Sequence, residues 1–146
     1  MSTLKIGICG WGNVATGLYK IAKKNIESIK KQGNLDIEIV VIGARRDNPN
    51  CKPENVIIER DIFNVVNHDI DVMVELIGGV DVAKDLILKA LKKKKHVVTA
   101  NKAVIYNHGD EIFACAKENG VKVLFESSVC AGTPIILSLI HISEPT

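Results

Sequence analysis

The feature that most constrains this chain is a glycine-rich turn that follows a short apolar run near its start. Residues 4–9 are apolar apart from Lys5, and Gly10, Gly12 and Ala15 follow in the pattern Gly-x-Gly-x-x-Ala. Between a strand and a helix, the first glycine permits a tight bend, the second lets a pyrophosphate approach the backbone, and the small third residue lets the helix pack closely. The helix start then offers N–H groups to the anion. This predicts a dinucleotide site at Gly10, Trp11, Gly12, Asn13, Val14 and Ala15, with a turn that only satisfies packing as the alternative.

Strand and helix patterns alternate along the rest of the chain. Strands are expected at residues 4–9, 36–44, 56–58, 71–77, 96–100 and 122–126, helices at 14–31, 82–93 and 110–119, and a turn or short helix at 62–66. The strands are continuously apolar, which is typical of a parallel sheet covered on both faces. The fold class is therefore α/β, a Rossmann-type doubly wound parallel sheet over residues 1–125. Such sheets bind ligands at the carboxyl ends of their strands.

The composition argues against two classes of partner. The chain has 146 residues, of which 47% are hydrophobic and 25% charged, and its net charge is +2. We therefore expect no nucleic-acid partner and no membrane association, since no apolar run is long enough to span a bilayer. Cys9, Cys51, Cys115 and Cys130 are widely scattered and have no zinc-site spacing. This pattern predicts reduced thiols and a cytoplasmic location.

Two arginines follow the second predicted strand, as Ala44-Arg45-Arg46. An NAD enzyme usually carries an acidic residue there for the ribose 2′-hydroxyl, whereas the planar fork of arginine suits the 2′-phosphate of NADP. Asp47 could instead serve the ribose, and the arginines could be ordinary solvated loop residues. The sequence thus favours NADP(H) and leaves NAD(H) open.

Polar residues also mark the next two strand exits. Glu75 lies near the end of a buried strand and needs a partner, for which backbone N–H groups of a neighbouring loop would serve. Ile77 and Gly78 follow as predicted cofactor contacts, because glycine keeps side chains away from the cofactor. Lys102 follows the strand after that, where a lysine can donate a hydrogen bond or move a proton to a carbonyl oxygen. A solvated loop lysine is the alternative.

With these residues assembled, the chain resembles homoserine dehydrogenases. The matching segments are GICGWGNVATG, DVMVELIGG, KKHVVTANKAVI and FESSVCAGTPII, over about residues 4–136. The resemblance implies NADP-dependent interconversion of L-homoserine and L-aspartate 4-semialdehyde in threonine, methionine and isoleucine biosynthesis. It also implies a homodimer or homotetramer and a catalytic Lys102 that contacts nicotinamide and substrate. A monovalent cation, sodium, would be bound by Glu126, Val129, Ala131 and Thr133.

The last residues depart from the family pattern. The family continues after Ile136 into a substrate domain, of which residues 126–136 would be the start. Residues 137–146, LSLIHISEPT, instead read like a translated sequencing adapter, and we expect them to be non-native. A real amphipathic end is the alternative. We also expect the chain by itself to bind NADP(H) weakly and not to turn over homoserine, because catalysis needs groups on both sides of the reacting carbonyl.

Two other functions remain open on the sequence. One is a sugar or diaminopimelate-pathway oxidoreductase with the same cofactor domain, although the sugar enzymes usually carry Glu-Lys-Pro where this chain has Asn101-Lys102-Ala103. The other is a non-enzymatic NAD(P)-sensing module. A sensor needs no lysine at the nicotinamide, and it usually has an added DNA-binding or dimerising element.

Overall fold

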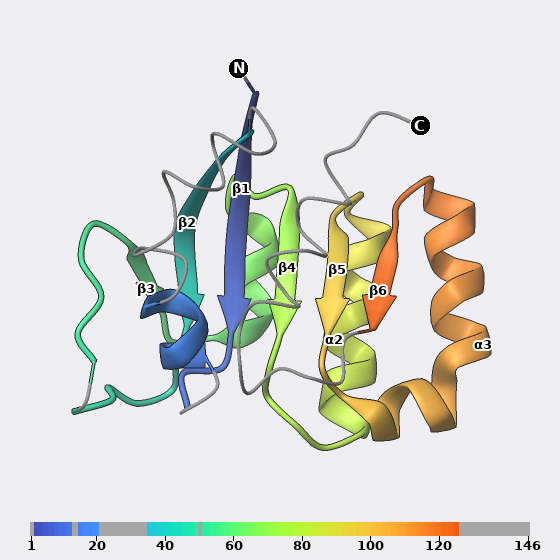
Figure 1. Ribbon diagram of the computed structural model, residues 1–146. Helices are drawn as coiled ribbons and strands as arrows, with labels where there is room; N and C mark the ends of the chain where they lie inside the picture. The colour runs from blue at the N-terminus through green and yellow to red at the C-terminus, as the bar shows by residue number, and fades with distance from the viewer. Residues whose placement is uncertain (1, 13–14, 21–34, 50, 126–146) are drawn as a thin grey trace.

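The strands of this protein form one parallel sheet. The computed structural model describes residues 2–12, 15–20, 35–49 and 51–125. Within these ranges, six strands pair in parallel in the order β3-β2-β1-β4-β5-β6 (Figure 1). The chain builds β2 and β3 on one side of β1 and then crosses over to build β4, β5 and β6 on the other, which confirms the predicted doubly wound α/β sheet. The strands are β1 Ser2–Cys9, β2 Leu35–Gly43, β3 Ile57–Glu59, β4 Val72–Glu75, β5 His96–Thr99 and β6 Val123–Phe125.

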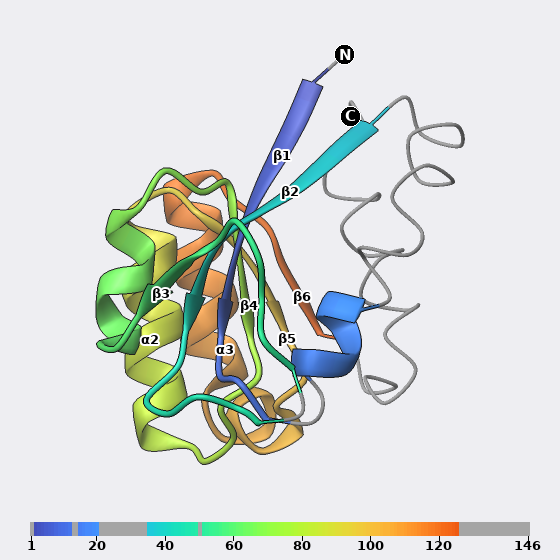
Figure 2. The ribbon, with the colours of Figure 1, turned by 90° about the vertical axis from the view of Figure 1, so that its left-hand side faces the viewer.

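Helices lie on both faces of this sheet. The helices α2 (Asp81–Lys92) and α3 (Lys102–Asn119) pack on one face, and the helical residues 15–20 lie on the other (Figure 2). The segment predicted as a turn or short helix is a 3-10 helix, η1 (Ile62–Asn67), which packs with α2. The predicted helix over 14–31 is confirmed at residues 15–20, and its remainder lies outside the described residues, as does everything from residue 126 onward.

Alternation along the strands gives the sheet a core on each face. Val72 and Val74 of β4 are buried in the cluster that contains Leu18, on the side of residues 15–20. Met73, between them, is buried with Leu86 of α2 on the opposite side. Each such side chain contributes about 1.5–3 kcal/mol when fully buried. Since both faces are covered, the strand has no polar face to present to solvent, and this explains its continuous apolar sequence.

An extra residue in β2 changes which way the end of that strand faces. The pairing of β1 with β2 shifts by one residue after Ile6, so that Val40 has no partner in β1. This β-bulge reverses the alternation for the residues that follow. Gly43 then faces η1, where a Cβ atom would come within 2.8 Å of Val65 Cγ2. The exit of β2 therefore requires glycine at this position.

The start of α3 was predicted wrongly. The sequence pattern placed the helix at residues 110–119, whereas α3 begins at Lys102. Asn101 caps the helix, because its Oδ1 accepts a hydrogen bond from Val104 N at 3.0 Å. The backbone of α3 is kinked at His108, which has a φ of −135°. The first two turns of the helix therefore do not continue the sequence pattern of residues 110–119. Lys102 is thus a helical residue and not a loop residue.

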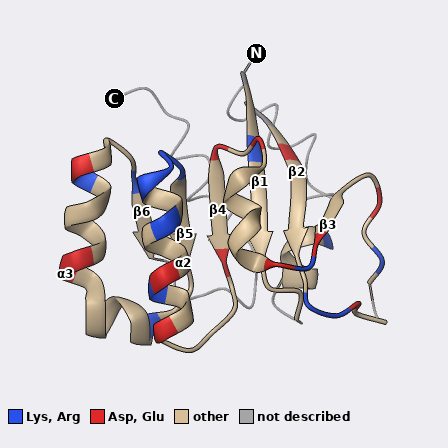
Figure 3. Cartoon of the chain, turned by 180° about the vertical axis from the view of Figure 1, so that it is seen from behind, with Lys and Arg blue, Asp and Glu red and all other residues tan. Residues whose placement is uncertain are grey.

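Charged residues of both signs are interspersed on the outer surfaces of α2 and α3 (Figure 3). Lys84 is followed by Asp85 on α2, and Lys117 by Glu118 on α3. In the described ranges, none of the helices has the length and apolar character needed to cross a bilayer.

Candidate cofactor site

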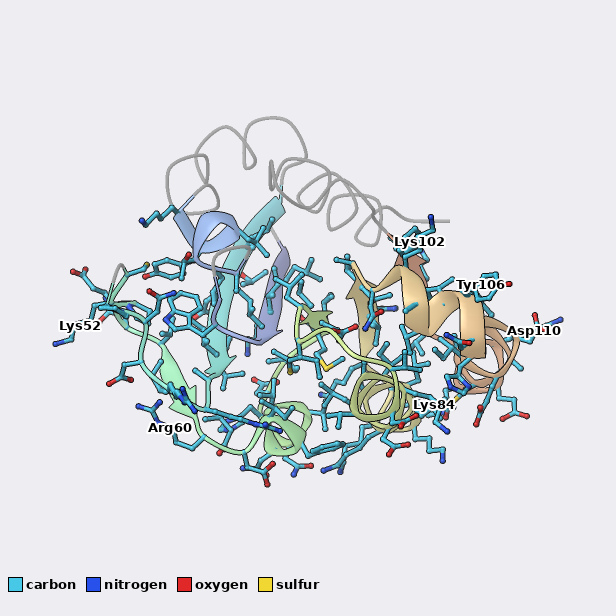
Figure 4. All side chains as sticks on the ribbon, turned by 90° about the horizontal axis from the view of Figure 1, so that it is seen from below. Lys52, Arg60, Lys84, Lys102, Tyr106 and Asp110 are labelled. Atoms are coloured by element: carbon cyan, nitrogen blue, oxygen red, sulfur yellow. The ribbon has the colours of Figure 1, made fainter. Side chains whose placement is uncertain are left out.

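A cavity of about 600 Å³ opens at the carboxyl ends of the strands, at the point where the strand order reverses between β1 and β4. Figure 4 looks onto this edge of the sheet, with Arg60 toward one side and Lys102 toward the other. The exits of β1, β2 and β4, together with η1 and the first turn of α2, form the walls. The lining residues are Gly10, Trp11, Gly12, Gly43, Arg45, Arg46, Ile62, Leu76, Ile77, Gly78 and Val82. Ligands of doubly wound sheets bind at this position.

Most of the predicted cofactor residues meet in this cavity. Those that line it are Gly10, Trp11, Gly12, Arg45, Arg46, Ile77 and Gly78. Ala15 does not line it but is buried in the core, with 1% of its surface exposed. A small residue at this position lets the helix approach β1 closely, in the role predicted for it.

The other predicted site residues are not brought into the cavity. Lys102 is exposed on the first turn of α3 and is absent from the lining. Outside the described residues lie two predicted cofactor contacts and the predicted cation ligands: Asn13, Val14, Glu126, Val129, Ala131 and Thr133. Among the residues that are described, no group of three His, Cys, Asp or Glu side chains could hold a metal ion.

The two glycines of the first turn differ in their surroundings. Gly10 has a φ of +106°, and a Cβ atom there would lie 3.0 Å from the carbonyl oxygen of Leu76. Gly10 N also donates to Gly43 O at 2.9 Å, which ties the turn to β2. A Cβ atom at Gly12, by contrast, would meet nothing within 4 Å. Gly10 is therefore needed by the fold itself, whereas Gly12 leaves its side of the backbone open to a ligand.

An arginine that the sequence analysis did not single out organises the exit of β2. Arg60, the first residue after β3, lies 2.6 Å from Asp47 Oδ1 through Nη2, and its Nη1 donates to Ala44 O at 3.1 Å. Asp47 is not among the lining residues, whereas Arg45 and Arg46 are. The cavity is thus lined by two cationic side chains, while the neighbouring carboxylate is paired outside it. The contact follows from the pairing of β2 with β3, which no local motif encodes.

Glu75, the last residue of β4, is completely buried. Its Oε2 accepts a hydrogen bond from Ile77 N at 2.9 Å, which confirms the predicted backbone partner, and its Oε1 accepts one from Thr99 Oγ1 at 2.7 Å. Burial raises the pKa of Glu75, and the hydrogen bonds from Thr99, Ile77 N and Gly78 N act against that rise. The sequence analysis missed Thr99, whose hydroxyl lies at the exit of β5.

The network continues from Thr99 to the start of α3. Thr99 Oγ1 accepts a hydrogen bond from Asn101 N at 3.0 Å. Asn101 Nδ2 donates to the carbonyl oxygen of Gly79, and Asn101 Oδ1 caps α3. The loop after β4 and the helix that begins at Lys102 are therefore joined by side chains.

Cys9, at the end of β1, is a buried thiol beside this network. Burial raises its pKa, and the charge of Glu75 raises it further. Its Sγ lies 3.8 Å from Ile62 O, to which it donates. Cys9 therefore stays neutral and packs in the core, and it is not a nucleophile.

The carboxylate of Glu59 anchors η1, which carries the lining residue Ile62. Hydrogen bonds from His68 at 3.0 Å, Asn64 at 2.5 Å and Asp61 N at 3.2 Å reach Glu59. The bond with His68, followed by those from Asn64 and Asp61 N, lowers the pKa of Glu59 from 4.5 to about 2. Because the folded state holds this proton less tightly than the unfolded state, the stabilisation is complete above pH 4.5 and is lost as the pH falls toward 2.

We expect Glu59→Gln to lose less stability than the wild type when the pH falls from 4.5 to about 2, since glutamine has no proton to gain. Urea unfolding at a series of pH values measures this. Glu111→Gln, an exposed substitution on α3, is the control and should follow the wild-type curve. An acid profile of Glu59→Gln identical to that of the wild type would contradict the assignment.

Residues 10–126 match the family model described as homoserine dehydrogenase, NAD binding domain. A homoserine dehydrogenase from Pseudomonas aeruginosa is 49% identical over 140 residues, which cover 95% of this chain and 32% of that protein. One from Bacillus subtilis is 34% identical over 142 residues, covering 95% of this chain and 33% of that protein. The chain therefore spans about a third of the length of these curated relatives.

Solved structures agree. The crystal structure of a homoserine dehydrogenase from Thiobacillus denitrificans has a TM-score of 0.80 and 36% identity, and the match covers 86% of this chain and 30% of that chain. A hyperthermophilic archaeal homoserine dehydrogenase in complex with NADPH has a TM-score of 0.73 and 25% identity, over 92% of this chain and 47% of that chain.

Proposed function

This chain belongs to the homoserine dehydrogenase family, and we propose that it is the cofactor-binding part of an oxidoreductase that interconverts L-homoserine and L-aspartate 4-semialdehyde with NADP(H). The observation that carries the proposal is the cavity at the strand-order reversal, floored by the turn of Gly10 and Gly12. The reaction belongs to the biosynthesis of threonine, methionine and isoleucine, and a cytoplasmic location fits it. The proposal includes a homodimer or homotetramer and a sodium site at Glu126, Val129, Ala131 and Thr133.

The proposed cofactor would run along the carboxyl ends of the strands. The pyrophosphate would lie over Gly12, facing the N-terminal end of the helix that contains residues 15–20. The adenosine end would extend toward Arg45 and Arg46 after β2, and the nicotinamide end toward Gly78 after β4. The NADPH complex of the archaeal relative supports a cofactor of this class.

The substrate would react beyond the nicotinamide end, where α3 begins. Bound NADPH supplies the hydride for reduction of the aldehyde. Lys102 would donate a hydrogen bond to the carbonyl oxygen and relay the proton that this oxygen gains, as general acids do. Its place at the first position of α3, next to the capping residue Asn101, fixes its backbone while its side chain is exposed.

The reaction is tested on the full-length gene product with L-aspartate 4-semialdehyde and NADPH. Oxidation of NADPH that depends on the semialdehyde would support the proposal. Cofactor binding without such turnover would favour a sensor, and turnover of a sugar or a diaminopimelate-pathway compound instead would favour another oxidoreductase.

The proposed preference for NADP over NAD is supported by the charges at the exit of β2. Arg45 and Arg46 line the cavity, and Asp47, which could bind a ribose 2′-hydroxyl, is paired with Arg60. A guanidinium that grips a phosphate makes charge-assisted hydrogen bonds, each of which contributes about 1.5–3 kcal/mol. A site of this composition favours the 2′-phosphate of NADP.

We expect Arg45→Ala to raise the Kd for NADPH by about tenfold or more and to change the Kd for NADH by less than about twofold. Isothermal titration calorimetry with each nucleotide measures both constants. Lys52→Ala removes another exposed cation, which lies on the same side of the molecule as Arg60 (Figure 4), and should leave the ratio of the two constants unchanged. A ratio that stays at the wild-type value in Arg45→Ala would rule out this role for Arg45.

A further inference from the structure

The network of Glu75, Thr99 and Asn101 joins the ends of two neighbouring strands. We propose that Glu75 and Thr99 are positioning residues, which lock the loop after β4 to the start of α3 and so shape the nicotinamide end of the cofactor site. The inference rests on the proposed dinucleotide function. It concerns residues that lie behind the cavity and do not line it.

The donors and acceptors of the network have a defined order. The backbone N–H of Asn101 can only donate, so Thr99 Oγ1 accepts from it, and the Thr99 hydroxyl proton is left to point at Glu75 Oε1. The N–H of Ile77 donates to the other carboxylate oxygen. Both oxygens of Glu75 therefore accept hydrogen bonds. Throughout the described ranges, every buried side-chain nitrogen and oxygen has a partner, so loss of one member would leave the next unsatisfied.

The contacts form a closed ring. From Glu75 the ring passes through Thr99 and the backbone N–H of Asn101, then from Asn101 Nδ2 to the carbonyl oxygen of Gly79, and back along the loop to Glu75. The loop needs such a clamp, because Gly78 and Gly79 have φ values of +74° and +76°, and glycine backbones adopt many conformations at little energy. The clamp holds Ile77 and Gly78, which line the cavity, in one arrangement.

The ring lies on one side of the switch point only. In the sheet order, β2 with its arginines lies on one side of β1, and β4 and β5, which carry Glu75 and Thr99, lie on the other. A dinucleotide whose pyrophosphate rests on the turn after β1 and whose adenosine end meets the arginines must place its nicotinamide end over β4 and β5. A defect in the ring should therefore affect the nicotinamide end and spare the adenosine end.

Because only the nicotinamide end should be affected, the positioning role can be tested on this chain by comparing two ligands. Thr99→Val keeps the shape of the side chain but removes the hydroxyl, and Thr99→Ser keeps the hydroxyl. Binding of NADPH is compared with binding of 2′-phosphoadenosine diphosphate ribose, which lacks only the nicotinamide. We expect Thr99→Val to raise the Kd for NADPH by about tenfold and to change the Kd for the analogue by less than about twofold. Thr99→Ser should behave like the wild type with both ligands, and the fluorescence enhancement of bound NADPH should fall in Thr99→Val alone.

A second variant opens the ring at another point. Asn101→Ser retains an oxygen that can cap α3 but removes the Nδ2 that donates to Gly79, so the same selective loss is expected. This variant decides the question if Thr99→Val does not fold, as judged by thermal unfolding. Equal weakening of both ligands, or normal NADPH binding by a folded ring variant, would overturn the positioning role alone. Absence of binding of either ligand to the wild type would overturn the proposed cofactor function and this inference with it.

Discussion

Replacement of Lys102 by alanine is expected to lower kcat/KM of the full-length enzyme by about 10²- to 10⁴-fold, which is the usual contribution of a general acid or base. The Kd for NADPH should change by less than about threefold, because Lys102 is not among the residues that line the cavity. We expect a large effect on kcat/KM because the proposed role of Lys102 is proton transfer to the substrate. Its side chain is exposed at the start of α3, beside the proposed nicotinamide end. Steady-state kinetics with L-aspartate 4-semialdehyde and NADPH, together with calorimetry, measure the two quantities.

Lys117→Ala is the matched control, because Lys117 is an exposed lysine in the last turn of the same helix. Its kcat/KM should stay within about twofold of the wild type, since exposed charges far from a site contribute little. The proposed role of Lys102 fails if Lys102→Ala retains wild-type kcat/KM. It also fails if the loss of activity is matched by an equal loss of NADPH affinity, which would indicate a binding role instead.

Gly10→Ala is expected to lower the free energy of unfolding by about 2–4 kcal/mol and to abolish NADPH binding. Two causes add up. A side chain at a φ of +106° is strained, and its Cβ atom would lie 3.0 Å from the carbonyl oxygen of Leu76, a backbone atom that moves only if the loop after β4 moves with it. Urea unfolding measures the stability, and calorimetry measures the binding.

Gly12→Ala, in the same turn, should affect ligand binding without affecting the stability of the fold. A methyl group there meets nothing within 4 Å, so the free energy of unfolding should change by less than about 0.5 kcal/mol. NADPH binding should nevertheless weaken strongly, because the methyl group occupies the side from which a pyrophosphate approaches the backbone. Unchanged stability of Gly10→Ala, or normal binding by Gly12→Ala, would show that the two glycines have been assigned the wrong roles.

The centre of the sheet could be predicted from the sequence because strands such as β4 are buried on both faces and therefore read as continuous apolar runs. β2 was expected at residues 36–44 and is found at Leu35–Gly43. The start of α3 could not be predicted in this way. Its signal is a single capping residue, Asn101, and the irregular backbone at His108 breaks the periodicity that would have extended the helix backward.

The residues of the candidate site also fall into those that could be predicted from the sequence and those that could not. The turn at Gly10 and the arginines after β2 could be predicted, because each is a pattern of residues that are neighbours in the sequence. Arg60 and Thr99 were missed because their partners, Asp47 and Glu75, lie 13 and 24 residues away along the chain. Those contacts depend on which strands are neighbours and on their register, which only the folded sheet provides.

The unpaired Val40 in β2 means that this strand could lose one residue without moving the edge of the sheet that faces the cavity. Loss of that one codon would leave a regular ladder in which Val41 still pairs with Gly7, so the remainder of the strand would keep the faces that it presents now. Arg45 and Arg46 would then project in the same directions, and Gly43 would still face η1. A deletion of three nucleotides at this position should therefore leave the proposed coenzyme preference unchanged.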